Sequence, residues 1–103
     1  MRQIEKFGRD IGREFHPERV ILFGSFAYGT PTEDSDVDVL VIMPHEGESV
    51  HKAVEIRLKV SPPFPVDILV RTPEKVRERL NMGDDFMLEI LEEGKVLYEA
   101  DDG

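Results

Sequence analysis

Three short apolar runs, separated by segments of helical length, limit most strongly how this chain can fold. Residues 20–23, 37–42 and 66–70 consist mainly of Val, Ile and Leu, a composition typical of strands that are covered on both faces. Residues 2–15 and 49–60 instead carry apolar side chains at near-helical spacing. This alternation of strands and helices predicts a single α/β domain.

Capping residues mark where the later elements begin and end. Thr72 and Pro73 predict the cap and the first residue of a helix over residues 73–80. Gly94 ends a further helix, and residues 95–99 after it are expected to form an edge strand. In the helix expected at 49–60, the apolar side chains that share one face are Val50, Ala53, Val54 and Leu58.

The composition narrows the classes of function. A length of 103 residues accommodates one compact domain, here residues 1–103. No apolar run reaches the roughly 18–20 residues that span a bilayer, the N-terminus lacks the apolar core of a signal peptide, and there is no cysteine. We therefore expect a cytoplasmic protein without a membrane partner. The net charge of −9 argues against binding of duplex nucleic acid, although a metal could bridge acidic side chains to the phosphates of a nucleotide.

Gly24 and Ser25 follow the first apolar run directly, where a strand would turn into a short helix. Glycine lets the backbone turn sharply and leaves room for a phosphate group. The N-terminus of the following helix offers free N–H groups and a positive dipole end, and the Ser25 hydroxyl adds a donor. The pair is therefore predicted to bind the phosphates of a nucleotide. The alternative is a plain strand-to-helix turn with a serine N-cap.

Asp36 and Asp38 flank Val37 at the head of the second apolar run. Side chains two residues apart in a strand point to the same face, so the two carboxylates repel each other unless a proton or a cation neutralises them. Such oxygen ligands suit Mg²⁺ or Mn²⁺. The alternative is that both acids only occupy an exposed strand end, although aspartate is depleted in strands.

Asp67 is the third candidate carboxylate, at the second position of the third apolar run. If the third strand lies beside the second, Asp67 can meet Asp36 and Asp38 at the same end of the sheet. Three carboxylates can hold two metal ions, and Asp67 could also act as general base for an attacking hydroxyl. The alternative is an acid on an edge strand that faces solvent.

The residues from Gly24 to Val41, followed by Asp67, resemble the signature of the nucleotidyltransferases of the DNA polymerase β superfamily. In that signature a Gly-Ser pair is followed, after a spacer, by Asp-x-Asp, and a third acid lies on a later strand. The short chain resembles the minimal nucleotidyltransferases, in which Gly-Ser-Phe-Ala-(Arg or Tyr)-Gly and Asp-Ser-Asp-(Ile or Val)-Asp are typical. Residues 24–29 and 34–38 fit these two patterns, and residues 90–99 resemble the family's ending.

The resemblance implies a fold, a reaction and a site. The implied fold is a polymerase β-like core of the α/β (α+β) class, a small mixed sheet flanked by helices. The implied reaction is the transfer of a nucleoside monophosphate, AMP from ATP, to a hydroxyl, with Mg²⁺ or Mn²⁺ as cofactor. Gly24 and Ser25 would bind the triphosphate, whereas Asp36, Asp38 and Asp67 would hold the metals and carry the catalysis.

The resemblance also implies a partner. Such proteins are commonly paired with a helical protein of the HEPN type, and this chain would then be the antitoxin of a toxin–antitoxin pair. Because nothing in so short a chain resembles an acceptor-binding domain, we expect a partner protein or a homodimer interface to present the acceptor hydroxyl. Two other readings stay open: a non-catalytic module that neutralises a toxin by occlusion, and a nucleotidyltransferase for small molecules such as aminoglycosides.

Overall fold

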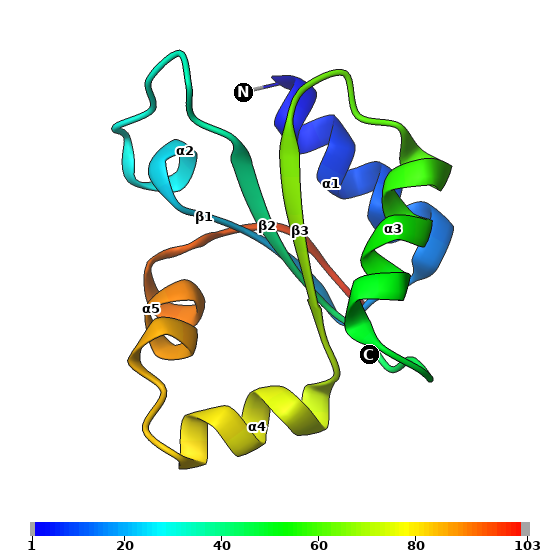
Figure 1. Ribbon diagram of the computed structural model, residues 1–103, viewed down its shortest axis with the longest axis vertical. Helices are drawn as coiled ribbons and strands as arrows, with labels where there is room; N and C mark the ends of the chain where they lie inside the picture. The colour runs from blue at the N-terminus through cyan, green and yellow to red at the C-terminus, as the bar shows by residue number, and fades with distance from the viewer. Residues whose placement is uncertain (1, 102–103) are drawn as a thin grey trace.

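The computed structural model describes residues 2–101, in which a four-stranded mixed sheet lies between two layers of helices (Figure 1). The elements in chain order are α1 (Arg2–Phe15), β1 (Arg19–Phe23), α2 (Ser25–Tyr28), β2 (Val37–Ile42), α3 (Ser49–Val60), β3 (Val66–Arg71), α4 (Pro73–Asn81), α5 (Asp85–Glu93) and β4 (Lys95–Glu99).

The strands are ordered β3-β2-β1-β4 across the sheet. β1 pairs antiparallel with β2 and with β4, whereas β2 and β3 are parallel and are connected through α3, as a parallel pair requires a crossover. The register sets Phe23 opposite Asp38, and Asp38 opposite Asp67. The mixed sheet flanked by helices that the resemblance implied is thereby confirmed.

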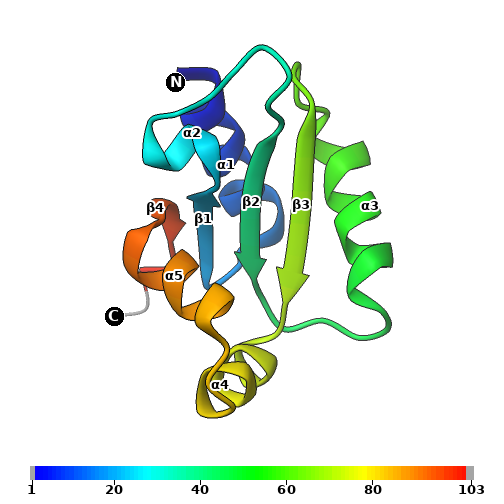
Figure 2. The ribbon, with the colours of Figure 1, turned by 60° about the vertical axis from the view of Figure 1, so that its left-hand side comes forward.

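Alternating side chains divide the sheet into two covered faces. On one face, Val39 and Val41 of β2 pack with α1 and with Ile56 of α3. On the other face, Leu40 and Ile42 pack with Val76 of α4 and with α5. Figure 2 shows α5 in front of β1 and β4 and α4 near the lower end of the sheet, whereas no helix lies in front of the upper part of β2 and β3. One end of this second face is thus left without a helical cover.

The element boundaries follow the capping signals. α1 ends at Phe15, directly before His16 and Pro17. The Thr72 hydroxyl accepts a hydrogen bond from the Lys75 backbone N–H at 3.1 Å, which caps α4. β4 lies at the edge of the sheet, and α4 and α5 occupy the predicted segments. No helix within residues 2–101 combines the length and apolar character needed to cross a membrane.

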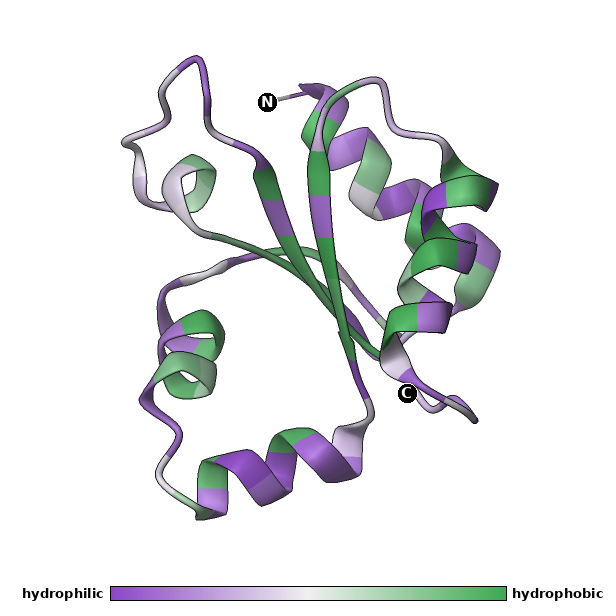
Figure 3. Cartoon of the chain, in the orientation of Figure 1, coloured by the Kyte–Doolittle hydropathy of each residue, from purple (hydrophilic) through white to green (hydrophobic). Residues whose placement is uncertain are grey.

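The apolar side chains that share one face of α3 are not the ones that this helix buries. Val50, Val54 and Leu58 are 61%, 51% and 74% exposed, and the fully buried residue of this helix is Ile56. Val54 and Leu58 each lie two residues from Ile56, and side chains two apart in a helix do not share a face. α3 therefore packs through the stripe that contains Ile56 and leaves its valine-leucine stripe exposed. Figure 3 shows hydrophobic and hydrophilic segments alternating along this helix.

Candidate active site

Asp38 and Asp67 occupy equivalent second positions on two neighbouring parallel strands. They are directly opposite each other in the register, and neighbouring strands lie about 4.8 Å apart. Strand alternation puts Asp38 on the same face as Leu40, and Asp67 on the same face as Leu69. The two carboxylates therefore meet at the end of this face that the helices leave open.

The carboxylates of this site repel one another. Burial raises the pKa of Asp38 above its ordinary value, and the negative charges of Asp67 and then Asp36 raise it further. Asp36 lies one residue before β2 and is exposed. A cation between these groups would relieve the repulsion, since opposite charge favours the ionised form of a carboxyl group.

Gly24 connects β1 to α2 directly beside Asp38. Its backbone has φ +75° and ψ −161°, a combination that only glycine adopts without strain. A Cβ atom added at Gly24 would overlap Asp38 Oδ2 and would lie 3.2 Å from Asp38 Cγ. The turn and the carboxylate therefore fit together only because position 24 has no side chain.

The short helix α2 begins at Ser25, one residue after this turn. The Ala27 and Tyr28 N–H groups donate to the Gly24 carbonyl at 3.0 and 3.1 Å. The first N–H groups of a helix, here those of Ser25 and Phe26, have no acceptor within the helix. Within residues 2–101 neither N–H group has an acceptor outside the helix, and both directly follow Gly24, which lies against Asp38. Gly24 caps this helix without a side-chain hydrogen bond, so the serine N-cap considered above is not formed.

The two carboxylates line a cavity of about 380 Å³, together with apolar side chains from β1, β3 and α5. Phe23 and Phe86 form one wall, with their rings 5.7 Å apart in an edge-to-face arrangement at 83°. A volume of this order is in the range of small-ligand sites. The carboxylates therefore line an apolar hollow and do not lie on a flat surface.

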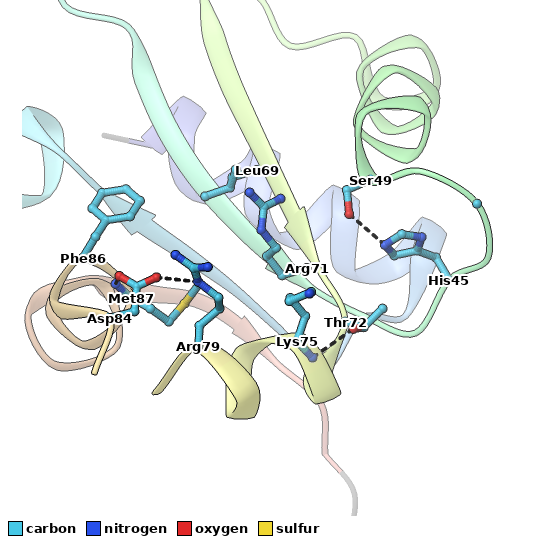
Figure 4. Close-up of a pocket in the computed structure, with 11 residues that line it drawn as sticks. His45, Ser49, Leu69, Arg71, Thr72, Lys75, Arg79, Asp84, Phe86 and Met87 are labelled. Carbon is cyan, nitrogen blue, oxygen red and sulfur yellow. Dashed lines mark hydrogen bonds and ion pairs between the residues drawn. The ribbon is translucent and has the colours of Figure 1, made fainter. Parts of the chain in front are cut away.

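A second cavity, of about 660 Å³, adjoins the first because Leu69 and Phe86 line both. Figure 4 shows side chains from β3, α4 and the start of α3 directed into it. Its charged lining is mostly cationic and consists of Arg71, Lys75 and Arg79 with the single acid Asp84. His45 also lines it and makes a 3.2 Å hydrogen bond between its Nε2 and the Ser49 hydroxyl.

Sequence reasoning missed this cationic cavity, although the sequence contains a signal for it. Arg71 follows Asp67 and Leu69 at a spacing of two on one strand, and alternate strand residues share a face. Lys75 and Arg79 are four residues apart on α4, which places them on one side of that helix.

The donor set fits a divalent cation, and the arrangement of the side chains fits it only in part. Asp38 and Asp67 supply hard oxygen ligands whose mutual repulsion a cation would remove. Within residues 2–101, however, no three His, Cys, Asp or Glu side chains are arranged as a ready metal-binding cluster. Asp36, outside the strand, is the carboxylate that would have to turn toward the other two.

A mixed sheet with paired carboxylates beside a glycine turn defines a nucleotide-transferring class of enzyme, and comparison with known proteins agrees. The family model of the nucleotidyltransferase domain matches residues 1–98. The chain therefore belongs to the nucleotidyltransferase domain family and is a nucleotidyltransferase, as the resemblance of its motifs indicated.

Individual relatives are similar to the chain over most of its length. Two proteins of Methanocaldococcus jannaschii, each named "Putative protein adenylyltransferase", are 34% identical over 82 residues and 36% identical over 69 residues. These alignments cover 79% of this chain and 78% of the first relative, and 65% of this chain and 70% of the second.

Two solved structures share the fold. The crystal structure of a protein from Sulfolobus solfataricus described as a "putative nucleotidyltransferase" has a TM-score of 0.64 at 16% identity, and the match covers 99% of this chain and 82% of that one. The crystal structure of a mutant of the toxin–antitoxin MntA-HpeT has a TM-score of 0.53 at 18% identity, over 97% of this chain and 73% of its own. At these identities the likeness concerns the fold.

Proposed function

We propose that this chain transfers AMP from ATP to a hydroxyl group of a partner protein, with Mg²⁺ or Mn²⁺ held by Asp36, Asp38 and Asp67. The observation that carries the proposal is the opposition of Asp38 and Asp67 on parallel strands, directly beside the glycine turn at Gly24. The name shared by the two Methanocaldococcus jannaschii relatives supports AMP as the transferred group and a protein as the acceptor.

Each residue then has a role in one substitution at phosphorus. Gly24, Ser25 and the free N–H groups that begin α2 bind the β- and γ-phosphates. A bound divalent cation supplies Lewis-acid stabilisation of the charge that develops on the phosphate oxygens. Asp67, which is exposed on the edge strand β3, accepts the proton of the acceptor hydroxyl. The hydroxyl oxygen bonds to the α-phosphorus, the bond from that phosphorus to the bridging oxygen breaks, and pyrophosphate leaves.

The partner proposed for this reaction is a helical protein of the HEPN type, with this chain as its antitoxin. The toxin–antitoxin MntA-HpeT, whose crystal structure has a similar fold, supports a pairing of this kind. An acceptor supplied by a second protein also agrees with the open end of the sheet face above Asp38 and Asp67. Neutralisation by occlusion, without transfer, is the rival that the experiment must exclude.

Label transfer tests the proposal directly. The protein is incubated with Mg²⁺ and the product of the adjacent gene, in parallel with α-labelled and γ-labelled ATP. We expect label on the partner from α-labelled ATP only, and loss of label in Asp67→Asn. Glu33→Gln is the matched control, because it removes an exposed acid from the neighbouring loop, outside the motif of residues 34–38. A stable complex that acquires no label would establish occlusion, and transfer of the γ-label would contradict adenylyl transfer.

Nucleotide binding provides an independent measurement. Titration calorimetry with Mg²⁺ and ATP compares the wild type with a variant that carries both Asp36→Asn and Asp38→Asn. We expect the double variant to lose Mg²⁺-dependent binding, because amides are weaker ligands and remove the negative charge that attracts the cation. Unchanged binding would refute the role of these two carboxylates as metal ligands.

A further inference from the structure

The cavity lined by Arg71, Lys75 and Arg79, beside the carboxylates, has no role in the binding of the nucleotide as proposed above. Resting on the proposed function, we infer that this cavity is the acceptor subsite and binds an oxyanion, a carboxylate or a phosphate, that the acceptor protein carries near its reactive hydroxyl. The hydroxyl then lies at Asp67, and the anion lies among Arg71, Lys75 and Arg79. Leu69 and Phe86, which line both cavities, lie between the position of the hydroxyl and that of the anion.

The charge of the cavity is opposite to that of the molecule. The chain has 22 acidic against 13 basic residues, yet three cations and one acid line this cavity. Arg79 is paired with that acid, with its Nε 2.8 Å from Asp84 Oδ2. In the described part of the chain, Lys75 reaches only an exposed acid outside the cavity, Glu78, at 3.5 Å, and such surface pairs are weak.

Arg71 is the cation that most requires a ligand. Within residues 2–101 no carboxylate lies within ion-pair distance of its guanidinium. Its Nη1 donates to the Val70 carbonyl at 2.6 Å, and a guanidinium has five N–H donors in total. The residue is half-buried, and Figure 4 shows its side chain directed into the cavity near Leu69. A partly desolvated charge without a counter-ion is costly, and a bound oxyanion would offset that cost.

The distance between the two ends matches an extended peptide. Asp67 and Arg71 are four residues apart on β3, which corresponds to about 13 Å along the strand. An acceptor peptide that runs beside this strand would therefore place its anion about four residues from the reactive hydroxyl. Leu69 and Phe86, between the two ends, offer apolar contact to the ring or stem of the hydroxyl-bearing side chain.

The nucleotide itself does not account for this cavity. Its phosphates are assigned to Gly24, Ser25 and the start of α2, on the β1 side of the carboxylates. The rest of the nucleotide, a ribose and a base, is uncharged and offers no negative charge to neutralise Arg71 or Lys75. A nucleic-acid acceptor is also disfavoured, because a polyanion would be repelled by a protein of net charge −9. An acidic or phosphorylated protein segment fits best.

Peptide binding in the absence of ATP tests the inference. Three fluorescent peptides of equal length carry one tyrosine and, four residues away, a pair of glutamates, a pair of glutamines or a phosphoserine. Anisotropy titrations at low salt compare the wild type with Arg71→Gln and with Arg77→Gln. Arg77 is the matched control, because it belongs to the same helix as Lys75 but does not line the cavity.

We expect the glutamate or the phosphoserine peptide to bind about tenfold more tightly than the glutamine peptide, as for a hydrogen bond to a charged group. Whichever anion binds better identifies the carboxylate or the phosphate as the natural group. Arg71→Gln should abolish that preference, and Arg77→Gln should change affinity about twofold or less. Equal binding of all three peptides, equal effects of the two substitutions, or stronger competition by an RNA oligonucleotide would overturn the inference.

A parallel titration with Mg²⁺ and ATP separates this inference from the proposed function. Asp38→Asn should lose nucleotide binding but keep the preference for the anionic peptide, and Arg71→Gln should do the reverse. If the wild type fails to bind ATP, the proposed function falls while the peptide data stand. If it binds ATP and ignores peptide charge, only the acceptor subsite is refuted.

Discussion

Replacing Gly24 with alanine should damage both the stability and the nucleotide site through a single contact. The new Cβ atom would overlap Asp38 Oδ2 and would lie 3.2 Å from Asp38 Cγ. Because Phe23 pairs with Asp38 in the sheet, neither backbone can move without breaking that pairing. The Asp38 carboxylate must therefore leave its position, or β1 must distort.

The loss in free energy of unfolding caused by Gly24→Ala has two parts, backbone strain and atomic overlap, which can be calculated separately. A non-glycine residue at φ +75° and ψ −161° pays about 1–3 kcal/mol in backbone strain. Overlap in a packed site adds about 1–3 kcal/mol. In an Asp38→Ala background only the second part disappears, since the nearest remaining atom, the Cβ at position 38, lies at an ordinary contact distance of 3.4 Å.

The contribution of the overlap is measured by urea denaturation of the wild type, Gly24→Ala, Asp38→Ala and the double variant, which form a double-mutant cycle. We expect Gly24→Ala to destabilise the wild type by about 1–3 kcal/mol more than it destabilises Asp38→Ala. Gly24→Ala should also weaken binding of ATP with Mg²⁺, which calorimetry detects. Gly29→Ala is the matched control: its φ is +87° but its Cβ would meet nothing within 4 Å, so it should cost about 1–2 kcal/mol with no coupling to position 38.

An absence of coupling would refute this reasoning. If Gly24→Ala costs the same with and without the Asp38 carboxylate, the two groups do not share the space that the structure assigns to them. If Gly24→Ala is destabilised but binds ATP as the wild type does, the position of Asp38 is not critical for the nucleotide.

Three further measurements test the carboxylate site, α3 and the cap of α4. The folded state raises the pKa of Asp38 above its ordinary value of 3.8, so the free energy of unfolding should fall as pH rises from 3.8 to the pKa of the folded state. Without metal at pH 7, Asp38→Asn should therefore raise Tm. This gain should disappear below pH 3.8, where the carboxyl group is protonated in both states. Ile56→Ala should cost about 2–5 kcal/mol and Leu58→Gln less than about 0.5 kcal/mol in urea denaturation. Thr72→Ala should cost about 1 kcal/mol by the same method, because it removes the cap of α4.

The sequence predicts the elements of this fold well because each is specified locally. The apolar runs of β1, β2 and β3 and the caps at Thr72 and Gly94 act over a few residues. The buried face of α3 could not be predicted in this way. This helix carries two apolar stripes, one with Ile56 and one with Val54 and Leu58, and only the contact with α1 and the sheet determines which is buried.

The candidate site likewise contains some residues whose proximity the local sequence predicts and others that only the packing of distant elements brings together. Asp36 and Asp38 are two residues apart, so strand periodicity predicts that they lie close together, whereas Gly24 comes beside Asp38 through the pairing of β1 with β2. Asp67 meets Asp38 only if β3 lies beside β2. This depends on the order of the strands, which the sequence does not determine and which the structure gives as β3-β2-β1-β4. The cationic cavity is still less local, because β3, α4 and the start of α3 each contribute to it, and no single segment carries its pattern.

Unusual local features lie along one sheet face, at Gly24 and the carboxylates near the start of β2 and β3 and at Arg71 at the end of β3. Gly24 adopts a backbone conformation that other residues avoid, and Asp38 is a partly buried acid near two other acids. Arg71 is a half-buried cation that has no acidic partner among residues 2–101. Such conflicts are expected where function opposes stability. A cation at the carboxylates and an anion at Arg71 would each relieve one of them. The free protein should therefore gain stability from each ligand separately, and a nucleotide and an acidic acceptor bound together should produce the largest rise in Tm.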